Sequence, residues 1–259
     1  MLKAAVAGDL TAPHLQLGPG FFVYKINLTR PRGSCTTMNN CVKTGLRGAL
    51  IVLEGCDRSG KSTQICRLLE RLGREGRRVV LMKFPDRTTP IGQMIDSYLQ
   101  QTVELDDHVV HLLFSSNRWE AMRKMADLLQ SGTTIIVDRY AYSGVAYSAA
   151  KGLAIDWCRH PDVGLLKPDK VLYITVSPEK AAERGQFGAE RYEKQDFQQR
   201  VHSMFLHLRD DSYWQTINGE RSIDDIHEEV YKLAAQTIKE SEHKTLLKLW
   251  TKDQDNVPL

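Results

Sequence analysis

Short apolar runs alternate with longer amphipathic stretches along most of the chain. Four clear runs and a weaker fifth have the length of strands, at 49–53, 79–84, 133–138, 171–176 and 213–217. The stretches with helical spacing are 61–72, 91–100, 107–129, 178–184, 196–211 and 222–242. Buried strands that alternate with helices predict an α/β fold, with a five-stranded parallel sheet covered by helices on both faces.

The two ends of the chain lack this alternation. Residues 1–47 contain scattered prolines and glycines, and we expect an irregular basic extension there. Residues 48–250 should form a single domain, and residues 251–259 a loose tail. Met38 offers an alternative start just before the predicted domain.

Charge and composition narrow the class of protein. The 259 residues are 42% hydrophobic and 26% charged, without an apolar run near the 18 residues of a membrane span, so we expect no membrane partner. Residues 1–47 contain six basic residues and one acidic residue, Asp9, and so carry a charge of +5. The remainder carries −2, so the extension accounts for the net charge of +3. A nearly neutral domain does not predict nucleic-acid binding.

The five cysteines show no CxxC or Cys/His metal spacing, so we expect reduced thiols and a cytoplasmic protein. A nuclear location stays open. Mitochondrial targeting by residues 1–47 is the weaker alternative, because their prolines interrupt any amphipathic helix.

The strongest motif is a phosphate-binding loop, or P-loop. Gly55, Gly60, Lys61 and Ser62 complete the pattern G-x-x-x-x-G-K-[ST] between a predicted strand and a predicted helix. Such a loop wraps phosphate oxygens with backbone N–H groups, and its lysine and serine serve the phosphates and Mg²⁺. No guanine-reading N/T-K-x-D motif follows, which disfavours a GTPase switch. Arg58 can stabilise a phosphoryl group in flight, or it can be an ordinary solvated loop arginine.

Other candidate residues follow the predicted strands. One predicted strand ends at Phe84 and is followed by the pair Asp86-Arg87. Another ends in the pair Asp138-Arg139. Ligands bind at this carboxyl edge in open α/β folds, where an aspartate can hold Mg²⁺ and an arginine can grip phosphate. Each Asp-Arg pair alone is better explained as a surface ion pair, but their joint position beside a P-loop favours a site.

Two faces of the predicted helix 107–129 carry different chemistry. Phe114 and Arg118 stand four residues apart, so a ring and a guanidinium can stack on a base and bond its edge; a core phenylalanine beside a solvated arginine is the commoner arrangement. On the opposite side, Leu112, Trp119 and Met122 predict a second buried face. We expect that face to form a homodimer.

The stretch 184–193 contains glycines and basic residues between two helices, which suits a lid that excludes water during phosphoryl transfer, or an ordinary charged loop.

Several motifs in this order resemble the thymidylate kinases. The resemblance spans about 48–250 and rests on LEGCDRSGKST at 53–63, FPDR at 84–87, HLLFSSNRW at 111–119 and VDRYAYSGVAY at 137–147. It implies phosphorylation of dTMP by MgATP, and Arg58 in the P-loop looks like the eukaryotic type. Cys56 is a mild departure from the family's pattern, and residues 1–47 have no counterpart.

The resemblance also implies roles for individual residues. Catalysis would use Asp57, Arg58, Lys61 and Asp138, with Ser62 and Asp138 at Mg²⁺. ATP would bind Gly55, Cys56, Asp57, Arg58, Ser59, Gly60, Lys61, Ser62, Thr63, Arg184, Asn218 and Arg221. The acceptor dTMP would contact Asp57, Phe84, Arg87, Phe114, Arg118, Arg139, Gly144, Tyr147 and Tyr192. Another nucleoside monophosphate kinase, a deoxynucleoside kinase and a nucleotide-binding regulator without turnover stay open as alternatives.

Overall fold

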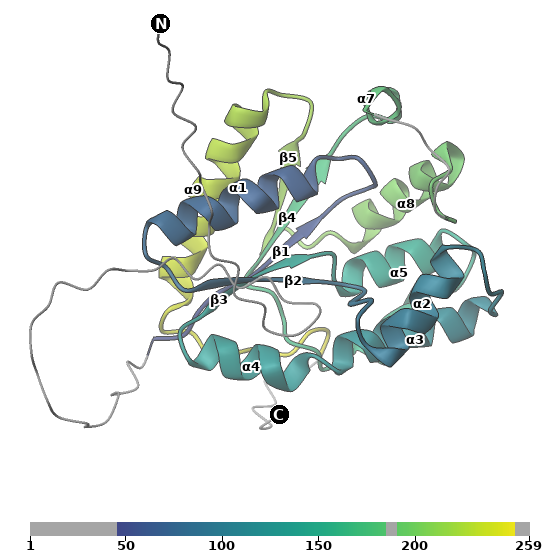
Figure 1. The fold of residues 1–259 in the computed structure, drawn as a ribbon, viewed down its shortest axis with the longest axis horizontal. Helices are drawn as coiled ribbons and strands as arrows, with labels where there is room; N and C mark the ends of the chain where they lie inside the picture. The colour runs from purple at the N-terminus through teal and green to yellow at the C-terminus, as the bar shows by residue number, and fades with distance from the viewer. Residues whose placement is uncertain (1–45, 185–190, 252–259) are drawn as a thin grey trace, which may run out of the picture.

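The computed structural model describes residues 46–184 and 191–251 (Figure 1). All five predicted strands are confirmed as one sheet: β1 (Leu50–Glu54), β2 (Val79–Lys83), β3 (Thr134–Asp138), β4 (Lys170–Thr175) and β5 (Trp214–Asn218). Their order is β2-β3-β1-β4-β5, and every neighbouring pair is parallel. The loop after β1 therefore lies at the centre of the carboxyl edge.

The helices lie in the connections between the strands. They are α1 (Lys61–Arg74), α2 (Pro90–Leu99), α3 (Asp107–Trp119), α4 (Met122–Gln130), α5 (Ala141–Ala149), α6 (Ile155–Arg159), the 3₁₀ helix η1 (His160–Asp162), α7 (Pro178–Glu183), α8 (Gln195–Leu208) and α9 (Ile223–Ser241). Serine side chains cap the first turns of two helices. Ser177 caps α7 by accepting from the amide of Lys180, and Ser222 caps α9 by accepting from that of Asp225.

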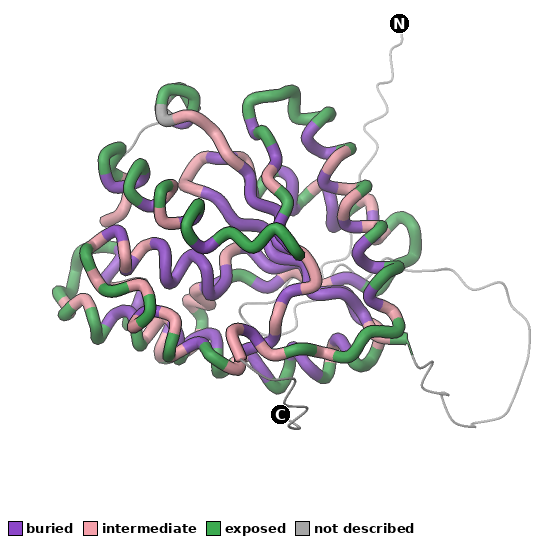
Figure 2. Tube along the Cα trace, turned by 180° about the vertical axis from the view of Figure 1, so that it is seen from behind, coloured by how far each residue is buried: buried purple, intermediate pink, exposed green. Residues whose placement is uncertain are grey.

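Helices cover both faces of the sheet, as predicted, because side chains alternate along each strand. In β1, Leu50 and Val52 pack on the side of α4, α5 and α8, whereas Ile51 and Leu53 pack on the side of α1 and α9. All four side chains are completely buried. Figure 2 shows the buried strands between layers whose outer surfaces are exposed.

The prediction of a single helix at 107–129 is wrong. The chain turns at Glu120 and Ala121, where the amide of Ala121 bonds to the carbonyl of Arg118, only three residues back. This tighter turn separates α3 from α4. Met122 consequently packs in the core at 3% exposure, whereas Leu112 and Trp119 on α3 are 45% and 39% exposed. Met122 does not belong to the proposed second face.

The sequence pattern did not indicate α5, α6 and η1. Seven of the nine residues of α5 are buried, with small and aromatic side chains all round the helix. A helix buried on all sides lacks the polar stripe on which periodicity depends. α6 and η1 are too short to show a period.

Arg47, at the end of the predicted basic extension, lies within the described residues. Its guanidinium forms an ion pair with Asp169 at 2.6 Å. Residues 1–45, 185–190 and 252–259 lie outside the described residues, and with them Met38 and most of the proposed lid and tail. Within the described ranges, Cys56, Cys66 and Cys158 are free thiols, and no helix is long and apolar enough to cross a membrane.

Candidate active site

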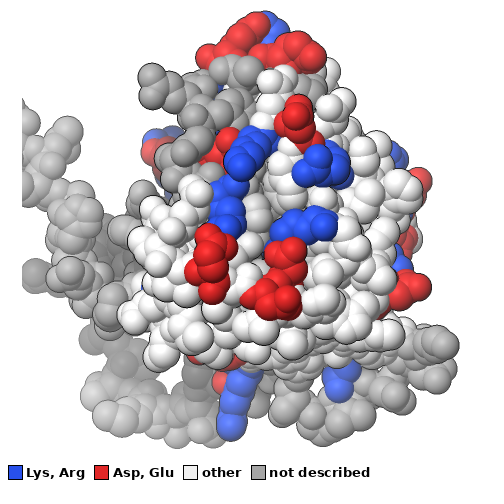
Figure 3. All heavy atoms as spheres, turned by 90° about the vertical axis from the view of Figure 1, so that its right-hand side faces the viewer, with Lys and Arg blue, Asp and Glu red and all other residues white. Residues whose placement is uncertain are grey.

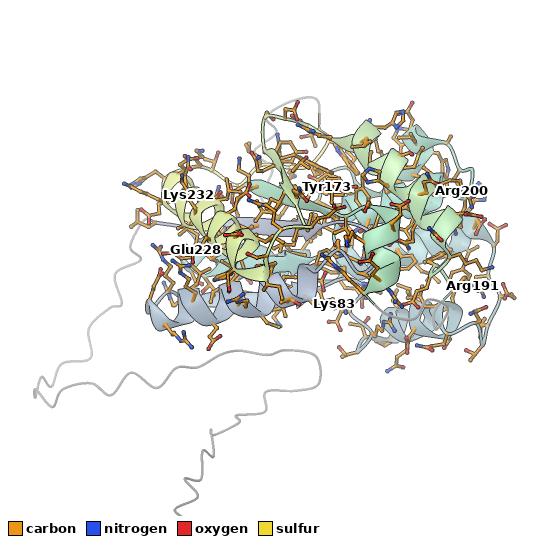
Figure 4. The ribbon with its side chains drawn as sticks, turned by 90° about the horizontal axis from the view of Figure 1, so that it is seen from above. Lys83, Tyr173, Arg191, Arg200, Glu228 and Lys232 are labelled. Atoms are coloured by element: carbon orange, nitrogen blue, oxygen red, sulfur yellow. The ribbon has the colours of Figure 1, made fainter. Side chains whose placement is uncertain are left out.

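The loops that carry the predicted site residues meet at the carboxyl edge of the sheet. Because β1 is central, the P-loop lies between the loops of β3 and β2 on one side and those of β4 and β5 on the other. Lys83, labelled in Figure 4, marks the carboxyl end of β2. Lys83 and Asp138 are paired in the register of β2 and β3, so the loops that follow these two strands begin at the same level of the sheet.

A cavity of about 530 Å³ joins the P-loop to the loops of β2 and β3. Most of the predicted site residues line it together: Asp57, Arg58, Gly60, Lys61, Ser62, Thr63, Phe84, Arg87, Phe114, Arg118, Asp138, Arg139, Gly144, Tyr147, Arg184 and Tyr192. Figure 3 shows the end of the molecule that carries α2, α3, α5 and α8, where Lys and Arg gather centrally with Asp and Glu above and below them.

The P-loop takes its shape from two glycines and a buried lysine. Gly55 has a φ of +147°, and a Cβ there would lie 2.4 Å from the carbonyl oxygen of Ile174. Gly60 has a φ of +96° and caps α1. The Lys61 ammonium, 6% exposed, donates to the carbonyls of Gly55 at 2.9 Å and Cys56 at 2.8 Å. Burial and the nearby Arg139 lower the pKa of Lys61 to about 8.

Asp57 forms hydrogen bonds with three residues outside the P-loop. Its carboxylate accepts from Arg139 Nη2 at 2.5 Å, from Gln198 Nε2 at 2.7 Å and from the Tyr147 hydroxyl at 3.3 Å. Burial opposes its ionisation, but Arg139 and Lys61 outweigh burial, so the pKa of Asp57 is lowered. A charged, oriented carboxylate therefore faces the cavity.

Two arginines at the site have left-handed backbones. Arg58 has a φ of 64° and Arg139 a φ of 65°, a conformation that costs free energy for any residue with a Cβ. Arg58 Nη2 lies 3.7 Å from the Glu193 carboxylate. The Arg139 guanidinium donates to Asp57, to the Gly55 carbonyl at 3.1 Å and to Ser143 Oγ at 3.2 Å. Both guanidinium groups thus reach the P-loop region from strained turns.

Asp138 ends β3 with one oxygen unsatisfied. Its Oδ1 is buried and has no hydrogen-bond partner among the described residues. The Ser62 side chain lines the same cavity. Oxygen ligands suit Mg²⁺, and a buried oxygen without a partner is costly unless a ligand completes it. The two residues fit the predicted Mg²⁺ site.

Phe114 and Arg118 both line the cavity, but they differ in their surroundings. Phe114 is half-buried beside the residues of α2. Arg118 is only 1% exposed, so it is not a solvated arginine. Its guanidinium pairs with Asp162 of η1 at 2.6 Å.

Four more acceptor residues are packed within the chain. Arg87 pairs with Asp96 of α2 at 2.7 Å. The Tyr147 ring lies 5.4 Å from the Arg139 guanidinium, and Tyr192 packs against the Tyr147 ring at a centroid distance of 5.4 Å. The Phe84 ring is buried. These contacts hold the walls of the cavity beside Asp57.

Arg184 links the P-loop to the loop after β5. Its guanidinium donates to the carbonyls of Arg58 at 3.2 Å and Gly219 at 2.6 Å. A second cavity, of about 600 Å³, lies at the ends of β4 and β5 and includes Cys56 and Asn218. Arg221 lines neither cavity; its guanidinium donates to Glu229 and to the Asn218 carbonyl.

Several functional contacts escaped the sequence analysis. Glu54, completely buried behind the P-loop, accepts from the amides of Tyr140 at 2.9 Å and Ser143 at 3.1 Å, and from Ser143 Oγ at 2.6 Å. Burial raises its pKa. Gln198 and Asp162 come from distant segments that show no motif. Only Glu54, inside the P-loop segment, carried a signal: a carboxylate at the end of an apolar strand.

Comparisons with known proteins show similarity in both sequence and fold. A family model described as thymidylate kinase matches residues 53–230. A thymidylate kinase from Arabidopsis thaliana is 52% identical over 206 residues, covering 79% of this chain and 78% of that protein. A human thymidylate kinase is 47% identical over 207 residues, covering 79% and 98%. The solved thymidylate kinase from Candida albicans superposes with a TM-score of 0.73 at 39% identity, covering 80% of this chain and all of the other.

Proposed function

Because this chain belongs to the thymidylate kinase family, we propose that its P-loop holds ATP and that the adjoining loops of β2 and β3 hold dTMP. The chain is a nucleoside monophosphate kinase that phosphorylates dTMP to dTDP with ATP, a step of nucleotide biosynthesis. This assignment of ATP and dTMP to adjoining loops rests on one observation. Lys61 and Ser62 share a single cavity with the acceptor-side residues Phe114 and Arg139.

On the donor side, residues 55–63 wrap the phosphates of ATP. The backbone N–H groups and the N-terminus of α1 attract the phosphate oxygens, and the Lys61 ammonium adds a full charge. Lys61 already lies inside the loop, bonded to two of its carbonyls, so it exchanges those partners for phosphate oxygens. The loop segments at Arg184, Asn218 and Arg221 serve the adenine, on the side of β4 and β5.

Ser62 and Asp138 would hold the Mg²⁺ ion. The support is the buried Oδ1 of Asp138, which has no partner among the described residues, and the hydroxyl of Ser62 in the same cavity. Mg²⁺ neutralises charge on the phosphate oxygens when it is bound. Ser62 and Asp138 supply oxygen ligands to it without any histidine or cysteine.

On the acceptor side, each wall of the cavity offers different chemistry. The Phe114 ring stacks on thymine, and Arg118 bonds the edge of the base. Arg87 and Arg139 bind the monophosphate with the planar donor geometry that suits phosphate. Asp57 accepts the 3′-hydroxyl, and the Tyr147 hydroxyl, 3.3 Å from Asp57, crowds the 2′ position and favours deoxyribose. Phe84, Gly144 and Tyr192 complete the walls.

The reaction needs little covalent work from the protein. An oxygen of the dTMP phosphate attacks the γ-phosphorus of ATP, and the bond to the leaving ADP oxygen breaks. Arg58 and Lys61 line the shared cavity. Arg58 stabilises charge on the transferring group, while Lys61 holds the donor phosphates. Asp57, anchored by three hydrogen bonds, keeps the acceptor sugar in place. Positioning and charge neutralisation supply most of the rate.

An acceptor panel tests this function. ADP release is measured with dTMP, dUMP, UMP, CMP and GMP at equal concentrations, with MgATP in excess. We expect the highest kcat/KM with dTMP. A clear preference for another acceptor would assign the chain to a different monophosphate kinase activity, and binding of both nucleotides without turnover would indicate a regulator.

We also propose that two copies associate through α3. Val109 and Leu112 are each 45% exposed, and Trp119 is 39% exposed. Light scattering after gel filtration should give twice the chain mass of 29.4 kDa. Leu112→Glu should halve that mass, because it places a charge on the apolar face, whereas the control Leu206→Glu on α8, where the leucine is 51% exposed, should not. A monomeric wild-type protein would contradict the proposal.

The free thiols of Cys56, Cys66 and Cys158 support a cytoplasmic location. Fractionation of cells that express the tagged full chain tests it, with and without residues 1–45. Recovery in mitochondria that depends on those residues would contradict it.

A further inference from the structure

The Arg118 guanidinium is held rigidly by one carboxylate. Arg118 Nε donates to Asp162 Oδ1 at 3.1 Å, and Nη2 donates to Oδ2 at 2.6 Å. Both side chains are almost completely buried, at 2% and 0% exposure. A two-pronged pair of this kind fixes the plane of the guanidinium as well as its position.

Asp162 is itself fixed to the helix that carries Arg118. Ser115 Oγ donates to Asp162 Oδ1 at 2.7 Å and lies 3.0 Å from the Pro161 carbonyl. The Trp119 indole donates to the same carbonyl at 2.7 Å. Since Ser115 and Trp119 flank Arg118 on α3, the carboxylate and the guanidinium form one rigid unit.

Gly144 of α5 closes the remaining side. A Cβ at this position would lie 2.7 Å from Arg118 Nη2 and 3.0 Å from Nη1, and the ion pair leaves the guanidinium no room to withdraw. Asp162 occupies Nε and one N–H of Nη2, and no hydrogen bond within the described residues uses Nη1. Arg118 also forms part of the cavity wall. The two N–H groups of Nη1 and the second N–H of Nη2 are therefore the donors left for a ligand.

A guanidinium can only donate hydrogen bonds. A donor fixed opposite position 4 of a pyrimidine can donate to a keto oxygen. It cannot bond to an amino group, because that group is also a donor. A mobile guanidinium could turn instead toward N3 of cytosine, which is an acceptor. The discrimination therefore depends on what prevents that turn.

We propose that Asp162 is a positioning residue that locks Arg118 as a donor to position 4 of the acceptor base, so that the site takes 4-keto pyrimidines and rejects 4-amino pyrimidines. The inference rests on the proposed function, in which Arg118 bonds the edge of the base. It assigns base selectivity to a residue of η1 that lines neither cavity.

The test is Asp162→Asn, assayed with dUMP and dCMP, which share sugar and phosphate and differ only at position 4 and the N3 atom beside it. The asparagine has one acceptor oxygen where the carboxylate has two, so it releases Nε or Nη2. We expect the ratio of kcat/KM for dUMP over dCMP to fall about tenfold or more. For dTMP, KM should rise while kcat changes little. The matched control is Asp156→Asn, an exposed aspartate on α6.

An equal loss with all acceptors and an unchanged ratio would overturn the proposal, because a merely structural role lowers activity without regard to the base. Should Asp162→Asn fail to fold, Ser115→Ala decides the question: it removes one hydrogen bond to Oδ1 and should lower the ratio by a smaller factor, and an unchanged ratio would overturn the proposal. Absence of dTMP phosphorylation by the wild-type chain would instead refute the proposed function.

Discussion

Glu54 gives the sharpest prediction about stability, because its carboxylate is completely buried and accepts three hydrogen bonds. Oε1 accepts from the amides of Tyr140 and Ser143, and Oε2 accepts from Ser143 Oγ. These bonds hold the turn after β3 and the first turn of α5 against the end of β1. The same turn carries Arg139 and leads to Gly144.

Two substitutions separate the hydrogen bonds from the charge. Glu54→Ala leaves two backbone amides and one hydroxyl without an acceptor, and each buried unsatisfied group costs about 1–3 kcal/mol, so we expect a loss of about 3–9 kcal/mol. Glu54→Gln keeps one oxygen for both amides, and its NH₂ can donate to Ser143 Oγ. We expect a loss of about 1 kcal/mol or less.

Chemical denaturation at pH 7 measures the free energy of unfolding of all three proteins. The pH dependence provides a second readout, because burial raises the folded pKa of Glu54 above its ordinary value of 4.5. A raised folded pKa means that the favourable contribution is complete below pH 4.5 and is lost as pH rises through the folded pKa. Glu54→Gln should therefore gain stability relative to wild type as pH rises. Equal losses for Glu54→Ala and Glu54→Gln would refute the reasoning from hydrogen bonds.

Three further predictions concern the site and its support. Arg58→Ala should lower kcat about 100-fold with little change in KM, and an unchanged kcat would remove Arg58 from the catalytic residues. Asp138→Asn should raise the Mg²⁺ concentration for half-maximal activity about tenfold, and an unaltered Mg²⁺ titration would remove Asp138 from the metal site. Burial lowers the folded pKa of His111 below its ordinary 6.5, so its contribution to stability is complete above pH 6.5 and is lost as pH falls through the folded pKa. Unfolding measured from pH 5 to 7.5 should show a flatter profile for His111→Gln, and equal slopes would contradict this assignment.

The fold was largely predictable from local patterns. The strands are short apolar runs because helices cover both faces of the sheet, and the helices α1, α2 and α9 each bury one stripe, so both patterns are visible in the sequence. The turn at Glu120 and the helix α5 were not predictable in this way. The turn depends on a single hydrogen bond that spans three residues instead of four, and α5 is apolar or small on all sides.

The sequence by itself determined the P-loop and the residues at the strand ends, because those motifs are contiguous and their chemistry follows from residue type and spacing. Only the tertiary structure decided which carboxylate faces which cation. Arg139 pairs with Asp57, 82 residues away, and Arg118 pairs with Asp162, 44 residues away. Such pairs form where parallel strands and their crossovers bring distant loops to one edge, and burial there makes an unpaired charge too costly. Arg118 could be found as a candidate from helical spacing alone, but its partner could not.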